Sequence, residues 1–521
     1  MDSKRNIVLG VCLLVLVGLA PTSAQVCPYN VPACTCNENI VSCFQLQEIP
    51  PLTNASNVTF ITAAIFDTGN ITSVNNGSLP PGLITLEFTG HPLTNISDDA
   101  FENSAETLTG LTINKSNLGR LPKALLNLTH LASLTIGDTH IDAWDDDILL
   151  HIANTLTVLS LPNVGLQKWP MWFSYFPLLT AAELSRNTLS SVPEDAFIYI
   201  NNTLLSLKLK QCNFTGIPEA LSSLSNLTLL DISGNNIDDG QVEELANLPF
   251  TRVIKELYLD STELTRIPDL YNMTSLLKLF LERSQIQNST ASLLPRSVTT
   301  LYLASNNLTA VPYDIDDLHN LLIVNLKLNA ITEVSFDMFP TRLISLDLSL
   351  NQLNKIAKAI ESDSSLLETL YLDHNPLTEI EPSAFKNLVS LTQLDLRFTR
   401  LTRLPLALSS LKQLSTLQMS NVTSLSCPSP PPESLVKWLR SSGSVIIYGD
   451  CNSGISIHDY LTIWATTRAT TQRKYPTGSG GPYDITTLGN TSTTDNADAH
   501  KPWLLQIFSC LLLLLSTGYY T

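Results

Sequence analysis

Positively charged residues are scarce in this sequence. Its 521 residues include 30 Lys and Arg against 47 Asp and Glu, which gives a formal net charge of −17. A protein that binds nucleic acid needs clustered basic side chains to neutralise the phosphates. We therefore expect no nucleic-acid partner.

Catalytic and cofactor-binding motifs are also missing. The eight histidines are scattered, and the chain has no His-x-x-x-His, Gly-x-Ser-x-Gly, phosphate-loop or kinase motif. Two aspartate groups, Asp145-Asp146-Asp147 and Asp314 with Asp316-Asp317, have calcium binding as an alternative role. Aspartate at the start of a helical turn more often caps it. The sequence thus predicts no enzyme, no cofactor and no metal site.

Long apolar runs occur at the two ends of the chain. Residues 1–24 contain Lys4 and Arg5, then an apolar run, then the small-residue exit Thr22-Ser23-Ala24. This order predicts a secretory signal peptide that is cleaved before Gln25, with a signal anchor as the alternative.

The other apolar run is the tail, residues 503–521, which contains no Lys or Arg and follows the polar spacer 490–502. This order predicts a GPI-attachment signal whose tail is exchanged for a lipid on the outer leaflet of the plasma membrane. The candidate attachment residues are Asn490, Ser492 and Asp495. The alternative is a single-pass tail helix without a cytoplasmic domain.

Between these ends, the pattern L-x-x-L-x-L-x-x-N-x-L recurs sixteen times at intervals of 22 to 27 residues. This period and pattern are the signature of leucine-rich repeats. The first positions of the repeats are Ile61, Leu83, Leu108, Leu131, Leu156, Leu179, Leu204, Leu227, Ile254, Leu276, Val298, Leu321, Leu343, Leu367, Leu391 and Leu414.

The spacing within one repeat predicts a short strand. In the thirteenth repeat, Leu346 and Leu348 should lie on one face of that strand. Ser345, Asp347 and Ser349 should lie on the other face. One repeat cannot bury its leucines alone, so neighbouring repeats stack with their strands ~4.8 Å apart. Because the return segments are bulkier than the strands, the predicted fold is an α/β solenoid, a horseshoe with a concave parallel β-sheet.

The ninth position of the repeat is mostly polar, which predicts that it pairs backbone groups where the strand turns away. Four repeats depart from this rule, with Gly69, His91, Val164 and Val422 at that position, and one has Cys212, which we expect to be a buried structural thiol. Five repeats have Ser or Thr there, and six have asparagine, namely Asn187, Asn235, Asn306, Asn329, Asn351 and Asn375.

Cysteines cluster at both ends of the repeats, which favours disulfide-linked caps in an oxidising compartment over a metal site. The motif Cys27-x6-Cys34-x-Cys36-x6-Cys43, followed by Ile49-Pro50, resembles the N-terminal cysteine cap of extracellular leucine-rich-repeat proteins with repeats of about 24 residues. That resemblance implies disulfides from Cys27 to Cys36 and from Cys34 to Cys43.

At the other end, Cys427, the amphipathic segment 434–439 and Cys451 resemble a reduced C-terminal cap, which implies a third disulfide between these two cysteines. With a lipid anchor, the plan is similar to that of the Nogo receptor, connectin and lamprey variable lymphocyte receptors. The expected organisation is a signal peptide (1–24), an N-terminal cap (25–52), about sixteen repeats (53–426), a C-terminal cap (427–451), a Thr/Ser/Gly-rich stalk (452–502) and a removed tail (503–521).

Aromatic residues occupy the solvent-facing central strand position of three successive repeats. Tyr258, Phe280 and Tyr302 should stand side by side about 5 Å apart on the concave face. Exposed aromatics beside charge are typical of protein-binding hot spots, although aromatics are also favoured in strands generally. The candidate ligand-binding residues are these three with Tyr371, Glu256, Asp260, Lys278, Glu282 and Arg283.

Fifteen Asn-x-Ser/Thr sequons predict a glycoprotein. None lies between Asn307 and Asn421, and Asn114 alone is expected clearly on the inner strands, so the concave face of repeats nine to fifteen should be largely clear of sugar. The sequons are at Asn54, Asn57, Asn70, Asn76, Asn95, Asn114, Asn127, Asn201, Asn213, Asn226, Asn272, Asn288, Asn307, Asn421 and Asn490.

Taken together, these features predict a GPI-anchored cell-surface recognition, adhesion or co-receptor protein. Its concave sheet would bind an extracellular protein or glycan, and signalling would need a transmembrane co-receptor. Two alternatives stay open: a structural surface-coat spacer without a specific ligand, and a single-pass membrane protein without a cytoplasmic domain.

Overall fold

The computed structural model describes residues 27–53, 60–287, 289–359, 364–442 and 445–467. The predicted signal peptide, the GPI candidates, the hydrophobic tail and most of the predicted stalk lie outside these residues. So do the sequons at Asn54, Asn57, Asn288 and Asn490.

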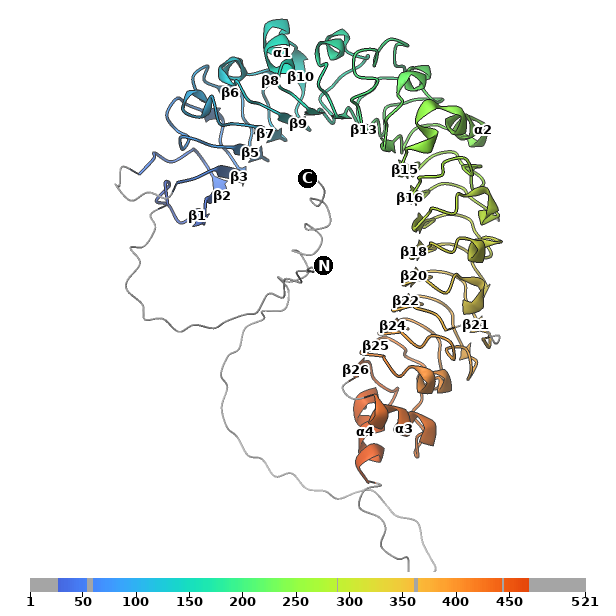
Figure 1. The fold of residues 1–521 in the computed structure, drawn as a ribbon. Helices are drawn as coiled ribbons and strands as arrows, with labels where there is room; N and C mark the ends of the chain where they lie inside the picture. Colours follow the sequence, from blue (N-terminus) through green and yellow to red (C-terminus); the bar gives the residue numbers. More distant parts are fainter. Residues whose placement is uncertain (1–26, 54–59, 288, 360–363, 443–444, 468–521) are drawn as a thin grey trace, which may run out of the picture. The chain divides into compact units, whose positions relative to one another are not determined.

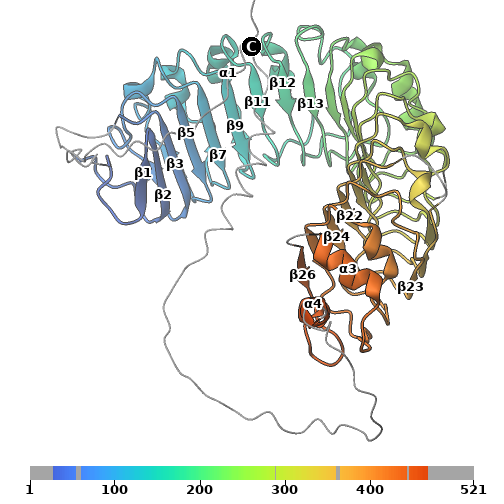
Figure 2. The same cartoon turned by 60° about the horizontal axis from the view of Figure 1, so that its bottom comes forward.

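The described residues form an arc whose inner side is one long β-sheet (Figures 1 and 2). β1 pairs antiparallel with β2, and every later strand pairs in parallel with the strand of the preceding repeat. Within the described part of the chain its nineteen strands are β1 (Cys34–Asn37), β2 (Ile40–Leu46), β3 (Ala63–Gly69), β5 (Thr85–Thr89), β7 (Gly110–Asn114), β9 (Ser133–Gly137), β11 (Val158–Ser160), β12 (Ala181–Glu183), β13 (Ser206–Lys208), β14 (Leu229–Asp231), β15 (Glu256–Tyr258), β16 (Lys278–Phe280), β17 (Thr300–Tyr302), β18 (Ile323–Asn325), β20 (Ser345–Asp347), β22 (Thr369–Tyr371), β24 (Gln393–Asp395), β25 (Thr416–Gln418) and β26 (Ile446–Tyr448).

The sheet confirms the predicted repeat. Each repeat contributes one strand, and the strand begins two residues after the first position of the motif. The fourth positions stand in register and are buried, as where Leu257 pairs with Leu279 and Leu279 with Leu301. Ser349 differs from its expected orientation, because it lies in the turn after the strand and is buried there.

The outer side of the arc carries short, varied segments. Small parallel pairings join β4 (Ser73–Val74) to β6 (Asn95–Ile96), β8 (Gly119–Arg120) to β10 (Ile141–Ala143), and β19 (Glu333–Val334) through β21 (Lys355–Ile356) to β23 (Glu379–Ile380). The α-helices are α1 (Asp146–Ala153), α2 (Asp239–Glu244), α3 (Glu433–Ser441) and α4 (Ile457–Thr467). The 3₁₀ helices are η1 (Glu102–Ser104), η2 (Lys123–Asn127), η3 (Met171–Tyr175), η4 (Glu219–Ser223), η5 (Leu245–Asn247), η6 (Pro249–Arg252), η7 (Ala291–Leu293), η8 (Ile315–Asp317), η9 (Phe336–Met338) and η10 (Leu406–Ser410).

Proline sets the start of several of these outer helices. Pro122, Pro170, Pro218 and Pro405 stand directly before η2, η3, η4 and η10, each with φ between −60° and −75°. This φ is the value that the proline ring imposes, so the segment is already directed into its turn.

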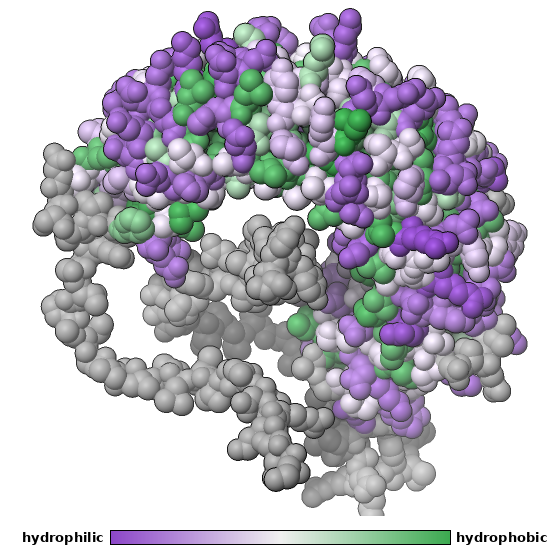
Figure 3. Space-filling model, turned by 45° about the horizontal axis from the view of Figure 1, so that its top comes forward, coloured by the Kyte–Doolittle hydropathy of each residue, from purple (hydrophilic) through white to green (hydrophobic). Residues whose placement is uncertain are grey.

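In the view of Figure 3, hydrophobic residues are scattered among hydrophilic ones over the described surface.

Asparagine at the ninth position joins neighbouring repeats. The Asn187 side-chain oxygen accepts hydrogen bonds from the backbone amides of Val164 (3.1 Å) and Leu166 (3.1 Å) in the preceding repeat. Its amide nitrogen donates to the carbonyls of Leu161 (2.9 Å) and Leu184 (2.8 Å). The other ninth-position asparagines likewise accept from the preceding repeat and donate to both repeats, namely Asn235, Asn306, Asn329, Asn351 and Asn375.

The residue before the ninth position is left-handed in all sixteen repeats, with φ between 48° and 70°. Only two of these sixteen residues are glycine, so most of them carry a strain of about 1 to 2 kcal/mol each. The conformation directs the eighth-position amide to the seventh-position carbonyl of the next repeat, as from Leu350 to Asp373 at 3.0 Å. The leucine periodicity does not predict this feature, because the eighth position shows no residue preference.

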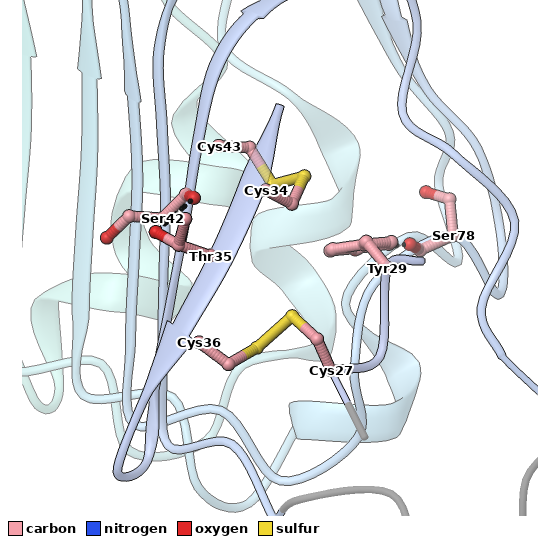
Figure 4. The surroundings of a disulfide bond; sticks show 8 residues. All are labelled: Cys27, Tyr29, Cys34, Thr35, Cys36, Ser42, Cys43 and Ser78. Atoms are coloured by element: carbon pink, nitrogen blue, oxygen red, sulfur yellow. Dashed lines mark hydrogen bonds between the residues drawn. A yellow bond between two sulfur atoms is a disulfide. The ribbon is translucent and has the colours of Figure 1, made fainter. Parts of the chain in front are cut away.

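Both ends of the arc are closed by disulfide-linked caps. At the N-terminal end, Cys27 bonds to Cys36 and Cys34 to Cys43, which is the pairing that the resemblance implies (Figure 4). Tyr29 lies buried beside these bonds and donates a hydrogen bond to the Ser78 carbonyl at 2.7 Å.

At the C-terminal end, Cys427 bonds to Cys451, and Trp438 of α3 donates its indole N–H to the Leu411 carbonyl at 2.9 Å. The disulfide closes the cap on itself, and the Trp438 hydrogen bond joins the cap to the repeats. The cap covers leucines that would otherwise face water at the end of the stacked repeats.

The C-terminal cap continues beyond its expected boundary at residue 451. Ile457 and Leu461 of α4 are buried, and Tyr460 donates a hydrogen bond to the Pro428 carbonyl at 2.6 Å. Residues 452–467, which we expected in the stalk, therefore belong to the cap. Ile457, Tyr460 and Leu461 are three and four residues apart, which is the spacing of one helix face. The threonines that follow them made the segment resemble a stalk.

We predict that Asn235→Ala lowers the free energy of unfolding by about 2 to 4 kcal/mol, because it leaves buried amides and carbonyls without partners. The matched control is Asn236→Ala, since Asn236 is the next residue and is exposed. Urea unfolding followed by circular dichroism measures both variants. Equal midpoints for the two would contradict the role given to the ninth position.

His91 occupies the ninth position of the second repeat and is buried. Its Nδ1 accepts a hydrogen bond from the Ile71 amide at 3.3 Å, and its Nε2 has no partner within the described residues. Burial lowers the pKa of His91, and the opposing charge of Asp67 is a smaller effect. At neutral pH the folded protein therefore holds His91 in its uncharged form.

Below the unfolded-state histidine pKa of about 6.5, the unfolded chain takes up this proton more readily than the folded chain does. We expect the free energy of unfolding to decrease as the pH falls from 7 to 5, and His91→Asn to reduce that decrease. Urea unfolding of both proteins at the two pH values tests this. An unchanged pH dependence in the variant would show that His91 does not contribute.

Candidate functional site

The last residues of β15, β16 and β17 bring three aromatic rings together on the concave face. Tyr258 and Phe280 are in register, with ring centroids 4.2 Å apart and an interplanar angle of 5°. Phe280 and Tyr302 follow at 4.9 Å and 19°. We call these three residues the aromatic stack.

The stacking determines which part of each ring meets solvent. Tyr258, Phe280 and Tyr302 are half-buried, and their facing surfaces cover one another. Because each ring is only half-buried, part of it still meets solvent. The aromatic stack therefore forms a narrow apolar ridge across three strands.

Charged side chains border the ridge. Tyr258 donates its hydroxyl hydrogen bond to Glu256 at 2.9 Å, and Lys278 Nζ lies 2.9 Å from the other Glu256 oxygen. Burial, together with the Glu256 carboxylate, raises the pKa of Tyr258, so the phenol remains protonated at neutral pH. Glu256 is thereby held between the two strands β15 and β16.

Carboxylates gather on the other side of the ridge. Asp260 accepts a hydrogen bond from the Glu282 amide at 2.7 Å, and Asn325 donates to the Glu282 carboxylate at 3.3 Å. Burial raises the pKa of both carboxyl groups; Asp231 adds to the effect on Asp260, Asp260 adds to that on Glu282, and Arg283 opposes both. This border is therefore rich in carboxylates, with Arg283 and Lys210 as the opposing positive charges.

Tyr371 lies apart from the aromatic stack, because β18 and β20 separate its strand β22 from β17. It stands in register between Asp347 and Asp395. Burial raises the pKa of Tyr371, and these two carboxylates add to the effect. The structure thus gathers eight of the nine predicted ligand-binding residues at one place and sets the ninth at another.

An ion pair that the sequence pattern did not predict lies beside Tyr371. Arg397 donates from Nε (2.9 and 3.0 Å) and Nη2 (2.6 Å) to the Asp395 carboxylate. The available signal was their spacing: two residues apart at a strand end, they emerge on the same face. A hollow of about 220 Å³ lies next to this pair.

The cysteine and the aspartates that the sequence analysis considered make structural contacts. Cys212 is buried, and burial raises the pKa of its thiol to about 11. Asp145 caps α1 by accepting from the Asp147 amide at 3.0 Å. Asp314 makes no side-chain cap, because it is left-handed; it accepts a hydrogen bond from Thr290 at 3.0 Å. Across the residues that the structure covers, no three His, Cys, Asp or Glu side chains form a group suited to a metal ion.

The described sequon asparagines are all at least partly exposed, and the concave Asn114 ends β7, well before the aromatic stack. A helix long and apolar enough to cross a membrane does not occur among the described residues.

Comparison with known proteins agrees with this architecture. The family model described as leucine rich repeat matches residues 154–237 and 365–424. Fibromodulin from Sus scrofa is 36% identical over 128 residues, which covers 24% of this chain and 85% of the relative. Lumican from Oryctolagus cuniculus is 30% identical over 161 residues, which covers 26% of this chain and 81% of the relative. This chain belongs to the extracellular leucine-rich-repeat family.

The solved structure of the mouse RP105/MD-1 complex resembles this family member with a TM-score of 0.56. The match covers 81% of this chain and 76% of that chain at 21% sequence identity, so it concerns the fold alone. The N-terminal disulfides agree with the extracellular branch of the family, because such bonds persist in oxidising compartments.

Proposed function

We propose that this protein is a cell-surface recognition protein that binds an extracellular protein through its concave sheet. The observation that supports this proposal is the aromatic stack of Tyr258, Phe280 and Tyr302 on the open face. Aromatic side chains dominate the energy of many protein interfaces because they bury a large apolar area at little entropic cost. Binding, rather than catalysis, is the role that these groups support.

The borders of the stack specify the partner further. Asp231, Asp260 and Glu282 border the aromatic stack with negative charge, while Lys278 is already paired with Glu256. A partner with apolar side chains at its centre and basic side chains toward this border would complement both features. The sequon-free interval from Asn307 to Asn421 leaves room for such a partner beyond β17.

We further propose that a GPI anchor attached within residues 490–495 holds the protein at the outer leaflet. The support is the sequence order of small residues, polar spacer and apolar tail. A protein held only by a lipid in the outer leaflet would need a transmembrane co-receptor to signal.

We predict that Tyr258→Ala combined with Tyr302→Ala weakens binding of the purified protein to partner-bearing cells at least about tenfold, since it removes the ends of the stack. Flow cytometry measures the binding. Tyr271→Ala is the matched control, because Tyr271 is 61% exposed and lies outside the concave strands. If the double variant bound like the wild type, the aromatic stack would not be the binding site. If the wild-type protein bound no cell type, the spacer role would be supported.

Anchoring is tested separately. Treatment of intact expressing cells with a phosphatidylinositol-specific phospholipase should release the protein into the medium, because the enzyme cleaves the lipid from a GPI anchor. Immunoblotting of cells and medium measures the release, with a transmembrane protein as the negative control. Complete retention on the cells would favour the tail helix instead.

A further inference from the structure

The hollow near the C-terminal end of the concave sheet is a second feature of interest. It spans β22, β24 and β25 and has a volume of about 220 Å³. The residues that matter for its chemistry are Tyr371, Gln393, Asp395, Arg397, Thr416 and Gln418.

The hollow results from side-chain length. Tyr371, Asp395 and Gln418 occupy the same position on three neighbouring strands, so a short side chain stands between two longer ones. Asp395 is only 5% exposed and is drawn along its own strand to Arg397, which holds its carboxylate through Nε and Nη2. Tyr371 and Gln418 start ~10 Å apart, which is two strand spacings. The space above Asp395 therefore accommodates one ring-sized group.

Three polar side chains around this space have no partner among the described residues. The side chains of Gln393, Thr416 and Gln418 make no hydrogen bond to other residues in the described part of the chain. No described aromatic ring stacks against Tyr371, in contrast to the rings of the aromatic stack. The hollow thus combines amide and hydroxyl groups, which donate and accept, with an aromatic wall.

We propose that this hollow binds one neutral pyranose unit of a glycan. The two glutamine amides and the Thr416 hydroxyl match the adjacent hydroxyls of a sugar ring, which also donate and accept. The Tyr371 ring offers an apolar surface to the C–H face of the sugar. The Asp395–Arg397 pair supplies charge-assisted hydrogen bonds in a fixed geometry. A small concavity with a few convergent polar groups is the usual form of such a site.

Charge selects against other occupants. Asp347 and Asp373 flank Tyr371, and their carboxylates would repel a sulfated or sialylated sugar. His374 lies 2.7 Å from Asp373 and stacks on Phe398, which directs it away from the role of an anion ligand. The carboxylate most deeply placed in the hollow, Asp395, already has Arg397 as its counter-ion, so an incoming lysine or arginine would compete with an existing pair.

The site is independent of the protein-binding proposal, since β18 and β20 lie between it and the aromatic stack. A glycan attached to the protein itself would compete with added oligosaccharides for the hollow, so it must be removed before the test. The sequon at Asn421 lies three residues beyond Gln418, and Asn421 is exposed. A glycan there is close enough in sequence to reach the hollow, so the variant Asn421→Gln is the appropriate background.

The test is binding of the purified Asn421→Gln protein, clustered on beads, to immobilised neutral, sialylated and sulfated oligosaccharides and to a lysine-rich peptide. We expect binding to a subset of the neutral oligosaccharides alone. Gln393→Ala combined with Gln418→Ala, and separately Tyr371→Ala, should each reduce that binding at least about tenfold. Gln352→Ala, at an exposed glutamine outside the hollow, and Tyr258→Ala should leave it unchanged.

Thermal unfolding of each variant shows whether it is folded. Because Gln393 is exposed and Gln418 is half-buried, we expect their substitution by alanine to leave the fold intact. The proposal fails if no neutral oligosaccharide binds, if the hollow variants bind like the parent, or if the acidic sugars or the peptide bind instead. Loss of cell binding in the Tyr258 and Tyr302 variant does not bear on this site, so the two proposals fail separately.

Discussion

The structure depends on how backbone polar groups are paired where each strand leaves the sheet. The leucines supply the stabilising burial, but their burial brings the turn into the interior, where an unpaired amide or carbonyl is costly. Two devices pair these groups across repeats. The ninth-position asparagines bridge adjacent turns, and the left-handed eighth position aims its amide at the next repeat. The stacked repeats are therefore held together by polar contacts between their turns as well as by apolar packing.

This dependence explains which parts of the fold the sequence could reveal. The leucine spacing predicted all sixteen strands and their register, because a period shared by many copies averages out local noise. It could not reveal the left-handed residues, since Leu328, Leu350 and Phe398 adopt a conformation that their side chains do not favour. The cooperation of neighbouring repeats imposes that conformation. The extension of the cap through α4 was not predicted for a different reason. Ile457 and Leu461 form an apolar pattern that is too short to indicate a buried helix.

The concave surface was only partly accessible from the sequence. Register is enough to place Tyr258, Phe280 and Tyr302 side by side, because parallel strands carry equivalent positions at one level. The hollow beside Tyr371 needed more, since it depends on Asp395 turning along its strand toward Arg397 rather than outward. That orientation is a choice between rotamers, and it depends on a partner that a pattern search does not weigh. The two zones also differ chemically: one is an apolar ridge of covered rings, the other an open polar recess.

Strand length divides the arc at one place. β7 and β9 share five residue pairs, whereas β9 and β11 share three, and so does each later pair of strands up to β26. Pro162, two residues after β11, has no amide hydrogen to extend the strand. The repeats of β3, β5, β7 and β9 also lack a ninth-position asparagine, so more of the contact between them is backbone pairing. A tensile load along the arc would therefore meet a change of stiffness between β9 and β11, and we expect the solenoid to deform first on the side with the shorter strands.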